Sequence, residues 1–161
     1  MNKALNVQPT LLLAFTVPGD PIPMERVKTG AQGQRYTPPR SRYYRAHVQR
    51  HLAYIEIPRD RFDFSPQQWR RREGVDELKL AERVELRVRL YFSNFRSRDN
   101  DNCLKAIQDA IVKSGALGDD NFKVLGRTSV DADIDRQNPR AEIELHRMPP
   151  LAAQPKKRRR R

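Results

Sequence analysis

Acidic side chains and one lysine are concentrated in a short segment of the sequence. Asp99 and Asp101 are two residues apart, Lys105 follows four residues later, and Asp119-Asp120 form a pair further on. Like charges this close repel and raise one another's pKa unless a cation lies between them. Hard cations such as Mg²⁺ prefer carboxylate oxygens and keep several water ligands. A divalent metal ion would therefore neutralise this group of acids.

The same residues also allow a purely structural interpretation. Asp and Asn are frequent N-caps, so Asp101 or Asn102 could begin a helix that ends near Gly115. Lys105 could then pair with Asp101 or Asp109, because each is four residues from it on the helix. A Gly-Asp-Asp turn is ordinary loop chemistry as well. Spacing alone leaves both interpretations open.

Strand and helix signals alternate along the chain, and these elements must position the acids. Strands are predicted where apolar residues form runs or alternate with polar ones, and helices where they recur every three or four residues. The predicted strands are 11–17, 84–92, 122–130 and 141–146, and the predicted helices are 40–55 and the segment after Asp101 or Asn102. The order β-α-β-α-β-β predicts a single α/β or α+β domain with a mixed sheet and two main helices.

Two stretches between these elements follow no regular period. Residues 57–80 predict an elaborated connection or insertion, in which residues 67–73 could form a short helix anchored by Trp69. Gly30 and Gly33 predict a mobile loop that carries cations between the first strand and the first helix.

Composition favours a soluble protein with a polyanionic partner. The 161 residues fit one domain, and 32 Lys and Arg against 20 Asp and Glu give a net charge of +12, half of it in residues 156–161. Cations that neutralise phosphates release counterions, which drives nucleic-acid binding. The single cysteine, Cys103, excludes an intramolecular disulfide and a Cys-rich zinc site. No apolar run approaches the roughly 20 residues of a membrane span, so we expect a soluble intracellular protein.

Cations around the first predicted helix are candidate phosphate contacts, with neighbouring tyrosines as supports. These residues are Arg26, Lys28, Arg35, Arg40, Arg42 and Arg45, with Tyr36, Tyr43 or Tyr44. Phe95 precedes the acids, where an exposed aromatic could wedge into DNA, but we expect it to pack under the sheet edge. His47 and His51 are four residues apart without an evident third zinc ligand, which favours a packed or solvated pair.

The motifs between residues 98 and 120 occur in a fixed order. An Asp-x-Asp-Asn motif is followed by a lysine four residues after its second Asp, by an Asp-Ala on the same helix and by a closing Asp-Asp pair. These are Asp99, Asp101, Asn102, Lys105, Asp109-Ala110 and Asp119-Asp120, with Gly19-Asp20-Pro21, Arg26 and Tyr36-Thr37-Pro38 upstream. The segment resembles the signature of RusA-type Holliday junction resolvases, endodeoxyribonucleases often carried by phages and prophages. The resemblance covers residues 14–147 and is looser in its N-terminal part.

The resemblance implies a RusA-like fold and a homodimer with an Mg²⁺ site in each subunit, Mn²⁺ being an alternative, and no small-molecule cofactor. Such an enzyme cuts two strands of four-way junction DNA in recombination and repair. Asp99, Asp101 and Asp120 would be the metal ligands, and Lys105 the essential basic residue. DNA contacts would come from Arg26, Lys28, Arg35, Tyr36, Arg40, Arg98 and Asn102.

The sequence pattern and the resemblance together give the expected boundaries, although the 57–80 insertion and the basic tail depart from the shorter members of the family. Residues 1–10 would be a flexible N-terminus, 11–148 a RusA-like nuclease domain that includes the 57–80 insertion, and 149–161 a disordered basic tail. The enzyme would act in the cytoplasm of a bacterial cell or phage-infected host. Two other functions stay open: a non-catalytic DNA- or RNA-binding module whose acids only cap a helix, and a general metal-dependent nuclease acting on flaps or RNA.

Overall fold

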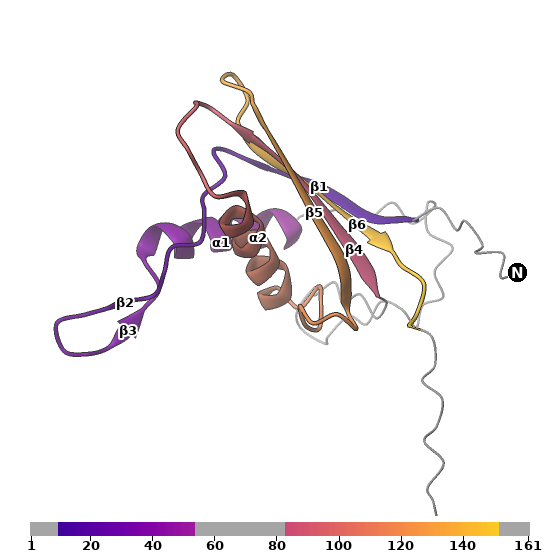
Figure 1. Cartoon of the computed structure of the whole chain (residues 1–161), viewed down its shortest axis with the longest axis horizontal. Coiled ribbons are helices and arrows are strands. Elements are labelled where there is room, and N and C mark those ends of the chain that lie inside the picture. The colour runs from indigo at the N-terminus through magenta and orange to yellow at the C-terminus, as the bar shows by residue number, and fades with distance from the viewer. Residues whose placement is uncertain (1–9, 54–82, 152–161) are drawn as a thin grey trace, which may run out of the picture.

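The computed structural model describes residues 10–53 and 83–151. Its elements, labelled in Figure 1, are β1 (Leu11–Pro18), β2 (Lys28–Thr29), β3 (Arg35–Tyr36), α1 (Pro39–Ala53), β4 (Val84–Phe92), α2 (Asn100–Lys113), β5 (Leu125–Ile134) and β6 (Arg140–Arg147). The predicted mixed α+β fold class is confirmed. The predictions for the first nine residues, for the connection 57–80 with its short helix, and for the tail from residue 152 lie outside the described residues.

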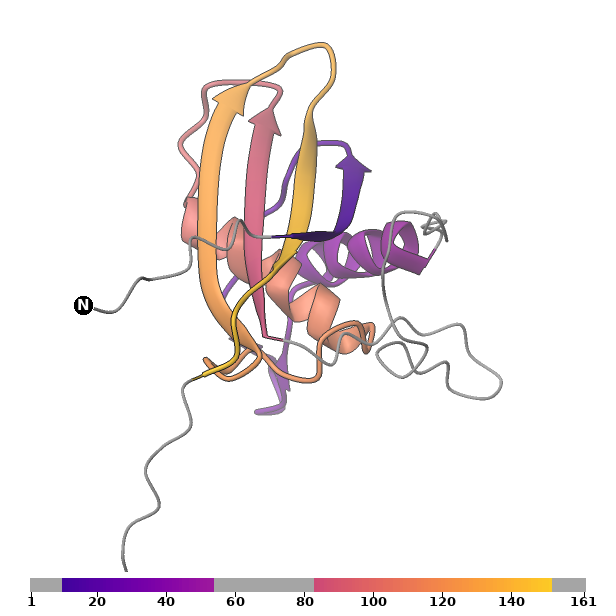
Figure 2. The ribbon, with the colours of Figure 1, turned by 90° about the vertical axis from the view of Figure 1, so that its right-hand side faces the viewer.

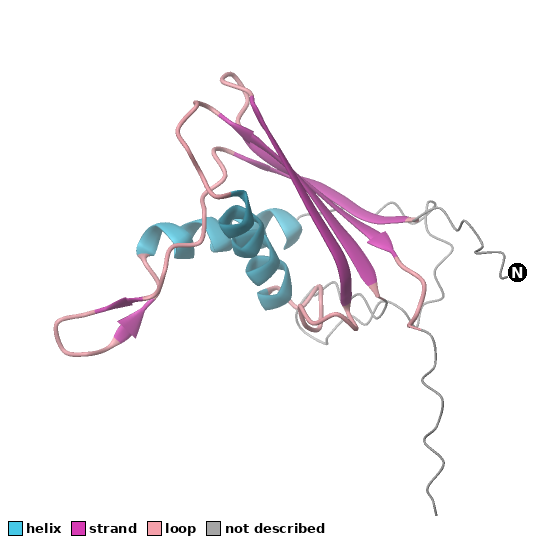
Figure 3. Ribbon diagram, viewed as in Figure 1, coloured by secondary structure: helices cyan, strands magenta, loops and turns pink. Residues whose placement is uncertain are grey.

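Four strands form one mixed sheet in the order β1-β6-β4-β5. β6 is antiparallel to β1 and to β4, whereas β5 is parallel to β4. Parallel neighbours need a crossover connection, and α2 provides it. Both helices cover the same face of the sheet (Figures 1 and 3), and Figure 2 shows its strands side by side. The candidate acids of the β4–α2 connection therefore sit at the boundary between the sheet and its helical layer.

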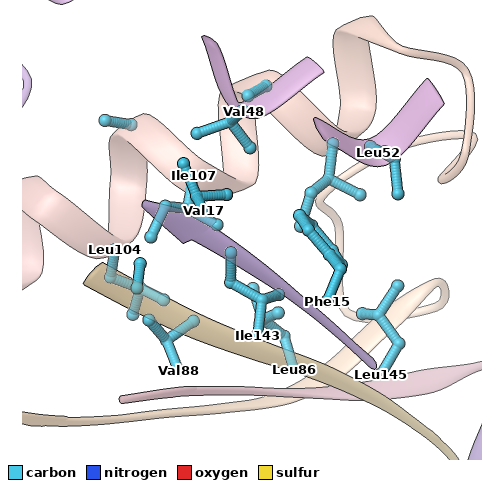
Figure 4. Packing of buried hydrophobic residues seen from close by; sticks show 14 of the residues in the cluster. Phe15, Val17, Val48, Leu52, Leu86, Val88, Leu104, Ile107, Ile143 and Leu145 are labelled. Atoms are coloured by element: carbon cyan, nitrogen blue, oxygen red, sulfur yellow. The ribbon is translucent and has the colours of Figure 1, made fainter. Parts of the chain in front are cut away.

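Apolar side chains between the sheet and the helices form the core. The period-2 pattern of β4 is confirmed, since Leu86, Val88 and Leu90 are all buried. Val48 of α1 and Ile107 of α2 are fully buried and pack toward the strands (Figure 4). Burying a side chain of this size contributes about 1.5–3 kcal/mol, so this layer fixes α2 on the sheet.

The third predicted strand has the wrong start. Phe122 to Val124 belong to a turn, because the carbonyl of Asn121 accepts hydrogen bonds from the amides of Val124 and Leu125 at 3.0 and 2.8 Å. β5 then continues beyond Val130 to Ile134, because it stays paired with β4 as far as Phe92.

The glycine-containing segment after β1 is a hairpin and not an unstructured loop. β2 and β3 pair in antiparallel register, and the amide of Gly30 donates to the carbonyl of Gln34 at 2.8 Å. Gly33 has a φ of 81°, which glycine adopts without a Cβ clash. The hairpin projects away from the sheet and helices (Figure 1). Within residues 10–53 and 83–151, no helix is long and apolar enough to cross a membrane.

Candidate active site

Asp99 forms the N-cap of α2. Its backbone is extended, and its Oδ1 accepts the amides of Asp101 and Asn102 at 3.0 and 3.2 Å. Its Oδ2 accepts from the side-chain amide of Asn102 at 2.7 Å. The prediction that Asp101 or Asn102 caps this helix is therefore wrong. A cap must precede the helix with extended backbone and reach the free amides of the first turn, and Asp99 meets both conditions.

Asp101 and Lys105 lie on the exposed side of α2. The Asp101 carboxylate is exposed and forms no hydrogen bond or ion pair with any other described residue. Lys105 has a side chain that is 56% exposed, and its Nζ lies 3.6 Å from Oδ1 of Asp109. Of the two pairings left open by the spacing, the lysine therefore makes the one with Asp109. Asp109 also lies 3.7 Å from the guanidinium of Arg45 on α1, so Arg45 has an acidic partner.

The Asp119-Asp120 pair lies at the other end of α2. The helix has 14 residues, so its length is about 20 Å. The connection that carries the pair follows the C-terminal end of the helix (Figures 1 and 2). Asp119 accepts the amide of Asp120 at 2.7 Å and the side-chain amide of Asn121 at 2.6 Å. The side-chain bond from Asn121 and the Asp120 amide lower the pKa of Asp119.

The structure thus brings Asp99 and Asp101 together within one turn, while Asp120 belongs to a separate acidic group. In the part of the chain that is described, no three His, Cys, Asp or Glu side chains are arranged to hold a metal ion. The three-carboxylate ligand set stays a prediction.

Asp20, which the sequence motif includes without a role of its own, anchors the segment in front of Asp99. Oδ1 of Asp20 accepts the amide of Ser93 at 2.8 Å, and its Oδ2 accepts the Ser93 hydroxyl. Burial opposes ionisation of Asp20, but these two bonds and the charge of Arg98 outweigh it and lower the pKa. At the far end of the segment, the amide of Met24 donates to the carbonyl of Asn102 at 2.9 Å. The β1–β2 connection therefore holds both ends of residues 93–102.

Arg98, a predicted DNA contact, is largely enclosed by protein. Its guanidinium lies 4.5 Å from the centroid of the Phe92 ring and 3.7 Å from Oδ1 of Asp20. It also donates to the carbonyl of Asn94 at 3.3 Å, and only 12% of its side chain is exposed. These contacts fix the backbone immediately before the acids.

Five of the other predicted DNA contacts are exposed at or near the hairpin. Arg26, Lys28 and Arg35 are exposed on or beside the β2–β3 hairpin and form no ion pair with a described acidic residue, and Tyr36 and Arg40 are exposed nearby. Tyr44 was a wrong candidate, because it is 3% exposed in the core, where burial raises the pKa of its hydroxyl.

The open face of the sheet has balanced charge. In the β4–β6 register, Arg87 lies opposite Glu144 and Arg89 lies opposite Glu142. Opposite charges directly across antiparallel strands attract and neutralise each other. Arg26, Lys28 and Arg35, by contrast, have no acidic partner among the described residues, so the hairpin region is a better candidate for phosphate contacts than this face of the sheet.

Phe95 does not pack under the sheet edge, so that prediction is wrong. Its side chain is 76% exposed, and the Arg136 guanidinium lies 5.5 Å from its ring centroid. Phe95 lies in the β4–α2 connection, three residues beyond the end of β4 at Phe92.

The remaining titratable candidates have structural surroundings. The rings of His47 and His51 meet edge to face at 4.6 Å, and Nε2 of His47 lies 2.9 Å from the carbonyl oxygen of Pro18. This matches the predicted packed pair. Cys103 is fully buried, and burial raises the pKa of its thiol to about 11, so it is no nucleophile near neutral pH.

Comparison with known proteins adds a family to this geometry. Residues 18–146 match the sequence model of the family described as endodeoxyribonuclease RusA. No curated protein matches the chain. The matched range runs from the end of β1 to the end of β6 and includes both acidic groups and the hairpin. The chain therefore belongs to the RusA family of endodeoxyribonucleases.

Proposed function

We propose that this protein is an Mg²⁺-dependent endonuclease that resolves four-way DNA junctions in recombination and repair. The observation that carries the proposal is the Asp99–Asp101 pair at the exposed start of α2, in a chain of the RusA family. The family description supports cleavage of DNA, and the choice of junctions as substrate is part of the proposal.

The residues at the start of α2 fit a hard divalent cation. Mg²⁺ in phosphate-processing sites is commonly held by one or two carboxylates, with water and substrate phosphate as the other ligands. Asp99 keeps acceptor capacity on Oδ2, which has one hydrogen bond, and Asp101 has no described partner. When bound, Mg²⁺ supplies a Lewis acid for the phosphate and increases the acidity of water.

Lys105 supplies the positive charge of the site. It lies one helical turn after Asp101, its Nζ is 3.6 Å from Oδ1 of Asp109, and its side chain is 56% exposed. A cation placed there can offset negative charge on the scissile phosphate or on the leaving 3′ oxygen. Asp109, the partner of this lysine, is itself paired with Arg45 of α1 at 3.7 Å.

We include a homodimer in the proposal, because one chain separates Asp120 from Asp99 and Asp101 by the length of α2. A second copy would bring another Asp120, which could complete the ligand set across the interface. Two-fold symmetry also suits paired cuts in a substrate that is itself two-fold symmetric.

DNA would be held mainly by charge outside the acidic site. The hairpin offers Lys28, Arg35 and Tyr36, and Arg26 lies just before it, all exposed. Residues 156–161 add six consecutive cations, which would neutralise phosphates without reading shape or sequence.

A cleavage panel tests the function. The wild-type protein is incubated with a four-way junction, a flap, a duplex and an RNA of matched sequence, in Mg²⁺ and in chelator. The proposal predicts paired cuts in the junction only, and only with Mg²⁺. Equal cutting of flaps or RNA would indicate a general metal nuclease, and binding without any cleavage would indicate a non-catalytic binding module.

A further inference from the structure

The exposed ring of Phe95 is part of neither the acidic groups at the ends of α2 nor the β2–β3 hairpin. At 76%, it is the most exposed large hydrophobic side chain of the described residues. A protein gains stability by removing such a ring from water, and this fold leaves it at the surface four residues before Asp99.

The turn under Phe95 is held in place by its neighbours. Oδ1 of Asn94 accepts the amide of Arg96 at 3.1 Å, and the Asn94 side-chain amide donates to the Ser93 hydroxyl at 3.0 Å. Ser93 is in turn fixed by both carboxylate oxygens of Asp20. The ring therefore projects from an ordered turn.

A second ordered turn supplies a cation beside the ring. Arg136 lies in the β5–β6 connection, with its guanidinium 5.5 Å from the Phe95 centroid. Oδ1 of Asp135 accepts the amides of Gln137 and Asn138 at 3.2 and 3.0 Å, which closes this turn. The amide of Asp135 also donates to the carbonyl of Phe92 at 2.9 Å and joins the two turns. Both connections lie at the same end of the sheet (Figure 1).

We propose that Phe95, with Arg136 beside it, is a stacking site for an unpaired nucleobase at the branch point of the DNA. This inference rests on the proposed function, because it takes branched DNA as the substrate. Sites for unpaired bases combine an aromatic face with nearby cations, and Arg96 and Arg136 are both exposed here. Inserted apolar side chains also open base steps in duplex DNA.

Phe95 is close in the chain to the acids of the proposed active site. Four residues from Phe95 to Asp99 span at most about 14 Å of chain. A base stacked on Phe95 therefore belongs to a nucleotide near the phosphate that Asp99 and Asp101 would face. Base capture at this point would favour branched DNA over duplex, because only branched DNA offers bases that are easily unstacked.

Fluorescence of 2-aminopurine tests the stacking site without cleavage. A four-way junction carries the probe next to the branch point, a duplex carries it in the same sequence, and chelator keeps the DNA intact. Wild-type protein is expected to raise the fluorescence of the junction, because the probe base leaves its stack. Phe95→Ala and Phe95→Leu should lose this rise, and Phe95→Tyr should keep it. Junction affinity of Phe95→Ala should fall roughly tenfold, with duplex affinity changed less than about twofold.

Three results would overturn the inference. The first is that wild-type protein causes no rise in fluorescence. The second is that Phe95→Ala and Phe95→Leu raise the fluorescence and bind the junction as strongly as wild-type protein does. The third is dissociation of the protein by Phe95→Ala in sedimentation, which would assign the ring to an interface between copies. The proposed function fails separately, when wild-type protein in Mg²⁺ does not cut the junction. Melting curves check folding, and an exposed ring should change them little.

Discussion

Asp99 combines two tasks that use the same carboxylate. It closes the first turn of α2 through the amides of Asp101 and Asn102, and it is a predicted metal ligand. The spacing could not separate these tasks, because residues 99–102 contain Asp and Asn only, and these residue types fit both a helix cap and a metal site. The extended backbone of Asp99 identifies it as the cap. The connection in front of it is fixed at Ser93 by Asp20, which lies far away in the sequence.

Two substitutions of Asp99 separate capping from catalysis. Asp99→Ala should destabilise the protein by about 1 kcal/mol, because the helix loses its cap, whereas Asp99→Ser should keep most of that stability. Both variants should lose junction cleavage, because neither has a carboxylate. Urea unfolding and cleavage in Mg²⁺ are the measurements. An Asp99→Ser variant that cuts at the wild-type rate would leave Asp99 as a cap alone.

Lys105 is tested by its effect on turnover. Lys105→Ala should change the unfolding free energy by at most about 1 kcal/mol, because the lysine side chain of its pair with Asp109 is 56% exposed. Single-turnover cleavage at saturating enzyme should fall by roughly a hundredfold, as when one electrostatic donor is removed. Lys113→Ala is the matched control on the last turn of the same helix and should cleave normally. A folded Lys105→Ala variant with full turnover would make the lysine a surface residue.

Among the helices and strands, the spacing of apolar residues predicted those elements that bury one face in the core. β4 and both helices follow their apolar patterns, and Gly115, expected near the helix end, has a φ of 84° just after α2. The hairpin was missed because β2 and β3 have two residues each, too short for any period. The exposure of Phe95 depends on the course of the β4–α2 connection in space, which no local pattern encodes.

The sheet itself carries a pH-dependent contact. Glu85 is 5% exposed on β4, with Arg87 Nη2 at 3.0 Å and Arg127 Nη1 at 3.7 Å from its carboxylate. The hydrogen bond from Arg87 lowers the pKa of Glu85 below its ordinary value of 4.5 despite burial. Because folding lowers this pKa, the ionised carboxylate stabilises the folded protein at every pH above the ordinary pKa. That stabilisation is lost as the pH falls through the pKa of the folded state.

Glu85→Gln should therefore destabilise the protein by about 1 kcal/mol near neutral pH, where the charge-assisted bond is lost. The difference from wild type should shrink below pH 4.5, as the wild-type carboxyl becomes protonated. Urea unfolding of both proteins across this range measures it. A difference that is constant with pH would show that the carboxylate charge does not contribute.

At the scale of the molecule, the two acidic groups are divided by α2, which makes the subunit arrangement decisive. If Asp120 acts across a dimer interface, mixing Asp101→Asn with Asp120→Asn should restore cleavage, because one of the two sites then has only wild-type residues. If all three act within one chain, the mixture should stay inactive. Subunits are mixed in mild denaturant and refolded together, and nicking of one junction strand is measured. Each variant alone is the control.

In the proposed function, the carboxylates at the start of α2 cut junction DNA with a divalent metal. The most direct measurement compares Asp101→Asn with wild type on one four-way junction, by gel shift in chelator and by cleavage in Mg²⁺. The variant is expected to bind the junction as tightly as wild type or more tightly, because a negative charge is removed, and its cleavage is expected to be abolished. An Asp101→Asn variant that cuts at near the wild-type rate would contradict the proposed function.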